Sequence, residues 1–294
     1  MARSVTPSSE QASAPVPAPD DGSARIAFGI DIGGTGIKGG PVDLASGQLT
    51  KERVRIPTPQ PATPKAVAAT VADVLKQSGW DGDAGATFPA VIKSGVAATA
   101  ANVDKSWIGT DVSGVLGEAT GHRVEVLNDA DAAGVAEMAY GAGRGSHGVV
   151  VMTTLGTGIG TAVFLHGQLL PNTELGHLEI DGHDAEKRAS EIVREREGLS
   201  WEKWAKRLTT YYRHLEALLW PDLIIVGGGA SRKAEKFLHL VDIRTKIVPA
   251  QLQNDAGIVG AALAVTVDIS RPEALQFHQA YRQSLGQSPP QTET

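Results

Sequence analysis

The segment DIGGTGIK combines chemical groups that suit the binding of a phosphate. Gly33 and Gly34 leave backbone N–H groups in a turn with no side chain to cover them. Thr35 adds a hydroxyl and Lys38 adds a positive charge. Asp31 ends the apolar run before the turn, where its carboxylate can order Mg²⁺ through water. These residues predict a phosphate-binding turn, and the alternative is a glycine-rich hairpin with an ion-paired aspartate.

A second segment of the same kind, TTLGTGIG, occurs in the other half of the chain. Its hydroxyls and glycines are Thr153, Thr154, Gly156, Thr157 and Gly158. A third glycine-rich segment, GGGAS, follows the apolar run LIIV. It offers Gly228 and Gly229 to an adenosine or a terminal phosphate, with a plain tight turn as the alternative. Because a clamp on phosphate needs donors on both sides, the paired turns favour phosphoryl chemistry over two unrelated hairpins.

Asp129 is the candidate for acid–base chemistry. It follows the apolar run VEVL, at the carboxyl end of an expected strand, where α/β proteins place their ligands. A carboxylate there can accept the proton of a hydroxyl as that hydroxyl is phosphorylated. The alternative is that Asp129 only caps the helix expected over residues 130–140.

The elements that must position these residues form a repeated pattern. An apolar strand over Ile26 to Ile32 turns through glycines into a strand over Ile37 to Val42, and RVRIPT suggests a third. The segment GVVVMTTLGTGIGTAVFL repeats this hairpin, and a repeat indicates a duplicated domain. Residues 65–77 have helical spacing, and strands alternate with helices in both halves. The pattern predicts an α/β fold.

We expect two domains, a small one over residues 25–127 and a larger one over 128–255. A last apolar helix, at about 256–270, is expected to pack back between the two halves. Residues 1–24 are rich in Ser, Ala and Pro and are predicted to be a disordered tail, as are residues 284–294.

Composition excludes several other classes of protein. The 27 Lys and Arg against 33 Asp and Glu give a net charge of -6, which argues against a general nucleic-acid binder. The absence of cysteine excludes disulfides and thiolate metal sites. No apolar run is long enough for a membrane span, and the first residues lack the apolar core of a signal peptide. A cytoplasmic protein is expected.

The ordered motifs DIGGTGIK, LND, TTLGTGIG and ELGH resemble those of the ROK family of sugar kinases. The strings TELGHLEIDGHDAEKRAS and QNDAGIVGAALA look most similar to the branch of actinobacterial polyphosphate glucokinases, which includes polyphosphate/ATP glucomannokinases. The resemblance covers about residues 25 to 270. It implies an actin-like (ribonuclease H-like) pair of α/β domains with the sugar in the cleft between them.

The resemblance also implies roles for particular residues. Asp129 matches the catalytic base of the family, and Asn128 and Asn102 match its sugar-binding amides. Glu174, His177 and Glu186 match further sugar ligands, and such groups suit a polyol because they exchange hydrogen bonds with hydroxyls. A polar loop is the alternative for these three. Many family members carry a cysteine-rich zinc motif here, but this sequence has LEIDGHDA, so no structural zinc is expected.

The implied activity is transfer of a phosphoryl group from inorganic polyphosphate or ATP, with Mg²⁺, to the 6-hydroxyl of glucose. Mannose as a second acceptor, and a monomer or homodimer, stay open. An ATP-only hexose kinase of the same family is the alternative, and the missing zinc motif weighs against an amino-sugar kinase. A repressor of this family would need a DNA-binding domain that the short tail does not supply.

Residues 187–213 contain eight Lys and Arg against four Glu. On their own they are typical of solvated, salt-bridged helices. If the charges instead face the cleft, residues such as Arg194, Arg196 and Lys203 would bind a polyanionic donor. Arg144 and Lys233 would then extend this surface.

Overall fold

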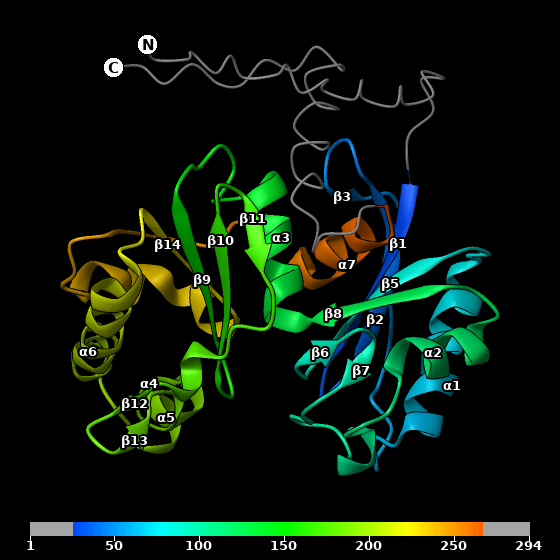
Figure 1. Ribbon diagram of the computed structural model, residues 1–294, viewed down its shortest axis with the longest axis horizontal. Helices are drawn as coiled ribbons and strands as arrows, with labels where there is room; N and C mark the ends of the chain where they lie inside the picture. Colours follow the sequence, from blue (N-terminus) through cyan, green and yellow to red (C-terminus); the bar gives the residue numbers. More distant parts are fainter. Residues whose placement is uncertain (1–25, 267–294) are drawn as a thin grey trace, which may run out of the picture.

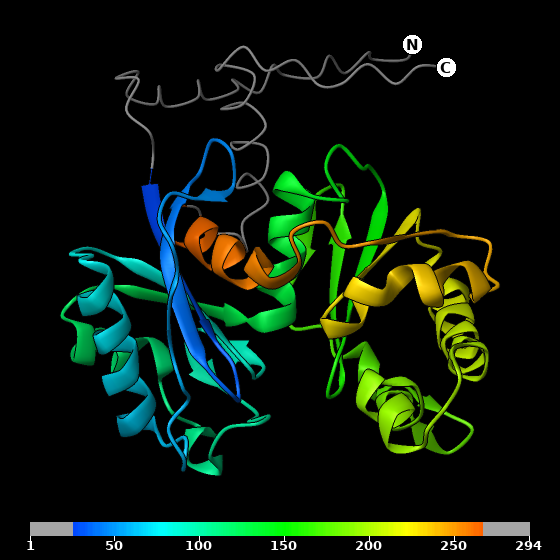
Figure 2. The same cartoon turned by 180° about the vertical axis from the view of Figure 1, so that it is seen from behind.

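The structure, a computed structural model, describes residues 26–266, which form two large β-sheets of the same strand order, two further sheets of two strands each, and helices around and between the large sheets (Figure 1; Figure 2). The predicted tails, 1–24 and 284–294, and the end of the helix predicted to reach 270 lie outside the described residues. Within residues 26–266, no helix is long and apolar enough to cross a membrane.

The first sheet has the strand order β3-β2-β1-β5-β8, and β4 also pairs with β2. Strands β1 and β2 form an antiparallel hairpin, while β5 and β8 run parallel to β1. The bounds are β1 (Ile26–Ile32), β2 (Ile37–Asp43), β3 (Gln48–Leu49), β4 (Val54–Ile56), β5 (Ala84–Phe88) and β8 (Val124–Asn128).

The second sheet repeats this arrangement in the order β11-β10-β9-β14-β15. Its hairpin β9–β10 is antiparallel, and β14 and β15 run parallel to β9. The bounds are β9 (Val149–Leu155), β10 (Ile159–Leu165), β11 (Gln168–Leu170), β14 (Leu223–Gly227) and β15 (Lys246–Pro249). The predicted α/β class and the duplicated hairpins are therefore confirmed.

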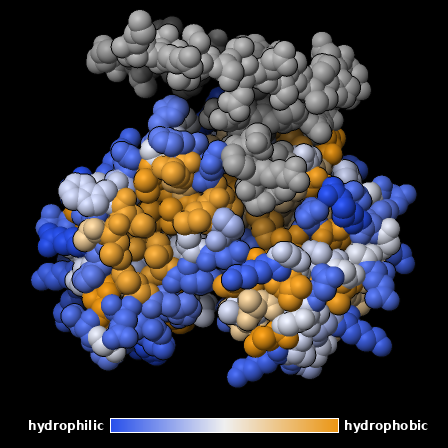
Figure 3. Space-filling view, viewed as in Figure 1, coloured by the Kyte–Doolittle hydropathy of each residue, from blue (hydrophilic) through white to orange (hydrophobic). Residues whose placement is uncertain are grey.

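The outer faces of the two sheets are covered by helices. Helices α1 (Pro64–Ser78) and α2 (Val112–Thr120) pack on the first sheet, and α6 (Trp201–Leu219) packs on the second. Thr63 caps α1 through its side-chain oxygen, with Pro64 at the first helical position, so the helix predicted at 65–77 starts one residue earlier. Apolar side chains also gather on the visible face of the second sheet (Figure 3), where Leu165 and Leu170 are exposed.

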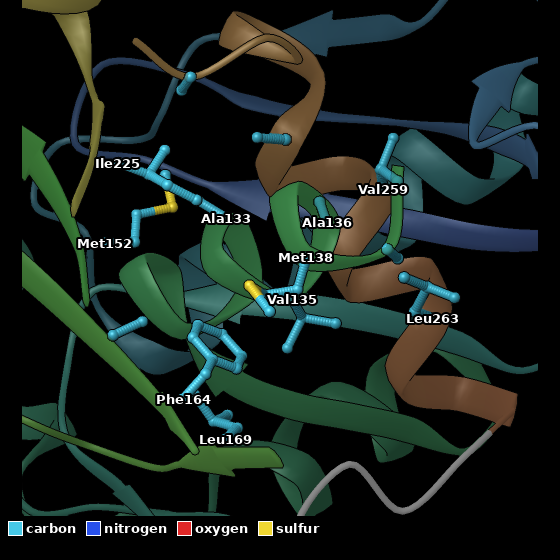
Figure 4. Packing of buried hydrophobic residues seen from close by; sticks show 14 of the residues in the cluster. Ala133, Val135, Ala136, Met138, Met152, Phe164, Leu169, Ile225, Val259 and Leu263 are labelled. Atoms are coloured by element: carbon cyan, nitrogen blue, oxygen red, sulfur yellow. The ribbon is translucent and has the colours of Figure 1, made fainter. Parts of the chain in front are cut away.

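Two helices lie between the sheets, α3 (Asp129–Tyr140) and α7 (Ala256–Thr266). Helix α7 lies directly on β1 and β5, where Gly29 and Gly85 make room for its backbone. A Cβ on Gly29 would lie 1.8 Å from the Ile258 carbonyl oxygen. Figure 4 shows this interior, with Val259 and Leu263 beside α3 and with Met152, Phe164 and Ile225 of the second sheet on its other side.

The remaining elements are short. The charged segment after residue 186 forms three helices, α4 (Glu186–Ala189), α5 (Glu191–Arg196) and α6. The GGGAS segment opens a 3₁₀ helix, η3. The others are β6 (Ile92–Lys93), β7 (Val96–Ala97), β12 (Glu179–Ile180), β13 (His183–Asp184), η1 (Lys105–Trp107), η2 (Leu175–His177), η3 (Gly229–Lys236), η4 (Leu238–Leu240) and η5 (Gln253–Asp255).

Candidate active site

A cavity of about 570 Å³ lies where the carboxyl end of β8 meets the β9–β10 turn. It brings together most of the residues that the sequence singled out in the second half of the chain, with Asn102 from the first half. The predicted residues in its lining are Asn102, Asn128, Asp129, Thr154, Gly156, Thr157, Gly158, Glu174, His177, Glu186 and Gly228.

Asp129 begins α3, and its carboxylate faces the cavity. Solvent reaches the carboxylate from the cavity side, while protein atoms crowd it on the other sides. This desolvation, followed by the negative charge of Asp31, raises the pKa of Asp129 to about 6. The N–H of Ala130 opposes the rise by donating a hydrogen bond of 2.9 Å. A carboxylate with this pKa is ionised at neutral pH and is basic enough to accept a hydroxyl proton.

The N-cap of α3 is Asn128 and not Asp129. The side-chain oxygen of Asn128 accepts hydrogen bonds from the N–H groups of Ala130 and Asp131, at 2.8 and 3.2 Å. Its amide nitrogen donates to the carbonyl of Ala90 at 3.0 Å. Asn128 therefore fills the N-cap role that was the alternative interpretation of Asp129.

Glu174, His177 and Glu186 lie close together on one wall of the cavity. The imidazole of His177 lies 3.9 Å from the carboxylate of Glu174 and 3.8 Å from that of Glu186. Glu186 also accepts a hydrogen bond of 3.3 Å from the N–H of Ile159. Burial, and then the charge of Glu186, raise the pKa of Glu174, while His177 lowers it. Carboxylates, which accept hydrogen bonds, and an imidazole, which can donate or accept them, therefore converge here. The hydroxyls of a polyol can bond to both.

The first glycine turn lies beside this cavity and not in its lining. Lys38 forms an ion pair of 3.0 Å with Asp31, which also accepts a 2.8 Å hydrogen bond from the hydroxyl of Thr87. The turn is closed by a bond from the N–H of Gly33 to the carbonyl of Gly36. Gly34 touches Asn102, because a Cβ there would lie 3.1 Å from that of Asn102. Thr35 at the tip is exposed.

The structure does not place Thr153 in the phosphate site that the sequence predicted. Its side chain is fully buried, and its hydroxyl lies 2.8 Å from that of Tyr212 in the core beneath α6. Successive strand residues point to opposite faces, so Thr154 lines the cavity and Thr153 does not. Gly229, which is also outside the lining, follows Gly228 and lies near Glu191 and Arg232.

Sequence reasoning missed two residues beside the site, Asp131 and Asn172. Asp131 is only 2% exposed, and burial raises its pKa to about 7. One of its oxygens accepts a 2.8 Å hydrogen bond from the N–H of Asn172, and the other has no partner among the described residues. Asn172 in turn pairs with both backbone groups of Ile92, at 2.8 Å each. This contact joins the two halves of the molecule.

The basic residues of 187–213 are largely neutralised by acidic neighbours. Five of the eight lie beside carboxylates: Lys187, Arg194, Arg196, Arg207 and Arg213. Arg194 also lies 4.1 Å from the ring centroid of Trp201, and its side chain is only 15% exposed. The salt-bridged alternative therefore describes most of this segment. Arg144 follows the end of α3 opposite to Asp129, roughly 18 Å along the helix.

No group of three or more His, Asp and Glu residues able to hold a metal occurs within residues 26–266. Asp31 and Asp129 are two acidic groups near the glycine turns, and they are close enough for the charge of Asp31 to raise the pKa of Asp129. Mg²⁺ is commonly held by one or two carboxylates together with substrate phosphates, so this pair fits such an ion.

Two sheets of one design, with a strand-end carboxylate between paired glycine turns, are the arrangement expected of an actin-like sugar phosphotransferase. The sequence profile of the ROK family matches residues 27–198. The chain is 56% identical over 245 residues to a polyphosphate glucokinase of Mycobacterium tuberculosis, covering 83% of this chain and 92% of that protein. The chain belongs to the ROK family.

Two further relatives agree with this assignment. A polyphosphate glucokinase of Mycobacterium leprae is 52% identical over 249 residues, which cover 84% of this chain and 77% of that one. The crystal structure of the inorganic polyphosphate/ATP-glucomannokinase from Arthrobacter sp. strain KM matches with a TM-score of 0.79 and 54% identity. The match covers 82% of this chain and 98% of that one. The fold inferred from the motifs is therefore confirmed.

Proposed function

We propose that this protein is a glucokinase that transfers a phosphoryl group from inorganic polyphosphate or ATP to the 6-hydroxyl of glucose, with Asp129 as general base. The observation that carries the proposal is the ionisable Asp129 carboxylate between the polar wall of Glu174, His177 and Glu186 and the glycine turn of Gly156 and Gly158. More than half of the aligned residues are identical to those of two polyphosphate glucokinases. This identity supports glucose as the acceptor and polyphosphate as a donor.

In this mechanism the sugar binds against the polar wall, which orients its 6-hydroxyl towards Asp129. Asn102 and Asn128 contribute amides on the facing side, although Asn128 already uses its side-chain oxygen to cap α3. Asp129 accepts a hydrogen bond from the hydroxyl and takes its proton as the bond to phosphorus forms. A raised pKa makes Asp129 a stronger base than an ordinary aspartate while leaving it ionised at neutral pH.

The donor phosphates are held by the two glycine turns, with Thr35, Thr154 and Thr157 as hydroxyl donors. Gly228 and Gly229 contact the more distant part of the donor. Mg²⁺ is the proposed metal, and when bound it neutralises charge on the donor phosphates. Asp31 would hold it through water, because its carboxylate oxygens keep lone pairs beyond those used by Lys38 and Thr87.

Several properties belong to the same proposal. The segments 25–127 and 128–255 are two domains, and α7 packs back between them. The enzyme works in the cytoplasm as a monomer or homodimer. Mannose is a second acceptor, for which the Arthrobacter glucomannokinase provides the support. An ATP-only hexose kinase is the alternative, and it has no observation in its favour beyond the glycine turns.

The acceptor atom can be tested with 6-deoxyglucose, which keeps every hydroxyl except the one to be phosphorylated. The proposal expects this sugar to bind and to inhibit competitively with glucose, without itself being phosphorylated. Phosphorylation of 6-deoxyglucose would show that another hydroxyl is the acceptor, and the assigned geometry would be wrong.

A further inference from the structure

Three residues on neighbouring strands of the first sheet stand in one line across the sheet. In the register of β1, β2 and β4, Asp31 is opposite Lys38 and Lys38 is opposite Arg55. Directly opposed residues on paired strands point to the same face, so the three side chains share one face. The lysine and the arginine thus lie beside the first glycine turn.

The guanidinium of Arg55 lies over the tip of that turn. Its Nη2 donates to the carbonyl of Thr35 at 3.4 Å, and a Cβ on Gly36 would lie 2.9 Å from the Arg55 side chain. Gly36 therefore leaves the space that the guanidinium occupies. A phosphate bound at the turn would have this arginine beside it.

The line of cations continues into the other half of the molecule through Asn254. The Nζ of Lys38 donates to the Asn254 carbonyl at 3.0 Å, and the Nη1 of Arg232 donates to the Asn254 side-chain oxygen at 2.9 Å. Arg232 belongs to η3, directly after the GGG turn. One residue thus connects a cation beside the first turn with a cation beside the third.

The two arginines at the ends of this line are not neutralised. Both are exposed, and within residues 26–266 each has only neutral hydrogen-bond partners. The nearby carboxylates pair with other cations: Asp31 with Lys38, Asp255 with Arg53, and Glu191 with Lys233 at 3.7 Å. This differs from the helices of 187–213, where five of eight basic residues face carboxylates.

We propose that Arg55, Lys38 and Arg232, the cation row, bind the part of an inorganic polyphosphate chain that extends beyond the phosphate being transferred. The proposal rests on the proposed function and assigns the donor subsite within it. Guanidinium groups bind phosphate through two parallel hydrogen bonds, and a linear polyphosphate presents a phosphate at every step along the row. ATP has three phosphates and ends in an adenosine, so it engages less of the row.

The test compares two double variants with the same loss of charge. Arg55→Gln with Arg232→Gln removes the ends of the row. Lys203→Gln with Lys206→Gln removes two exposed lysines of α6 that have no carboxylate partner among the described residues. For both variants and the unaltered protein, KM is measured for long-chain polyphosphate, tripolyphosphate and ATP over a series of KCl concentrations. Thermal unfolding and glucose binding establish that each variant is folded.

We expect the arginine variant to raise KM for long-chain polyphosphate at least about tenfold, and to raise KM for ATP and tripolyphosphate much less. For long-chain polyphosphate, the slope of log KM against log [KCl] should be smaller by about two in this variant, about one for each phosphate contact removed. The lysine variant should match the unaltered protein. Equal effects on all three donors, or an effect of the lysine variant alone, would overturn the cation row. If the unaltered protein turns over ATP but no polyphosphate, the donor assignment itself is wrong.

Discussion

Asp131 holds Asn172 through a 2.8 Å hydrogen bond, and Asn172 pairs with both backbone groups of Ile92 across the two halves of the molecule. The contact lies two residues along α3 from Asp129, so it connects the position of the Asp129 carboxylate with the relative placement of the two sheets. It depends on a carboxylate that is almost completely buried.

The pH dependence of stability tests this contact. Burial raises the pKa of Asp131 to about 7, so the folded state binds the proton more tightly than the unfolded state. The stabilisation is therefore fully present below the ordinary pKa of an aspartate, about 4, and is lost as the pH rises through 7. Asp131→Asn keeps an acceptor for Asn172 and removes the titration. We expect the variant to lose less stability than the unaltered protein between pH 4 and 8 in urea unfolding. Parallel pH profiles would contradict the buried ionisable group.

Replacing Asp129 by Asn should lower kcat by at least about a hundredfold, because the amide cannot take the hydroxyl proton. Glucose affinity, measured by calorimetry, should change little. In the unaltered enzyme kcat/KM should fall as the pH drops below about 6, where the base becomes protonated. A folded variant with near-normal turnover, or a pH profile with no fall in that range, would exclude Asp129 as the base.

The proposed binding of glucose by the polar wall can be tested separately from donor binding. Glu174→Ala should weaken glucose binding by about 1–3 kcal/mol for each buried hydroxyl contact that is lost. Donor binding should stay unchanged. Glu118→Ala, at an exposed glutamate of α2 that lies outside the cavity lining, is the matched control. If the Glu174 variant loses donor affinity and keeps glucose affinity, the two subsites have been assigned the wrong way round.

Much of the site was predictable because its residues are neighbours in the chain. The two hairpins carry their glycines and hydroxyls in continuous motifs, and Asp129 directly follows its strand. The direction of the Thr153 side chain could also have been predicted, because side chains alternate along a strand and those of Thr153 and Thr154 point to opposite faces. The prediction failed there because both hydroxyls were assigned to the same phosphate.

The contacts that sequence reasoning missed join residues far apart in the chain. Asn172 and Ile92 are 80 residues apart, and Asp131 has no local signal that marks it as buried. Arg55 belongs to the cation row because the strand register places it opposite Lys38, and Arg232 belongs to it because of its bond to Asn254. Neither relationship can be read from the sequence. A count of basic residues pointed instead to 187–213, where pairing with nearby carboxylates cancels the charge.

The nearby carboxylates of Asp31 and Asp129 lead us to expect that the activity requires Mg²⁺. Activity should disappear with a chelator and return when Mg²⁺ alone is added, because a divalent cation would neutralise charge on the donor phosphates. Dialysed protein should contain less than one zinc per chain by elemental analysis. One tightly held zinc per chain would contradict the expectation drawn from the absence of cysteine.

The most direct test of the central claim is an assay of purified protein with glucose, Mg²⁺ and long-chain inorganic polyphosphate, free of nucleotide, with chromatographic detection of the sugar product. We expect glucose 6-phosphate, formed in parallel with shortening of the polyphosphate, and the same product when ATP replaces polyphosphate. Asp129→Asn should slow both reactions by the same factor. No phosphorylated sugar with either donor would contradict the assignment of this protein as a glucokinase.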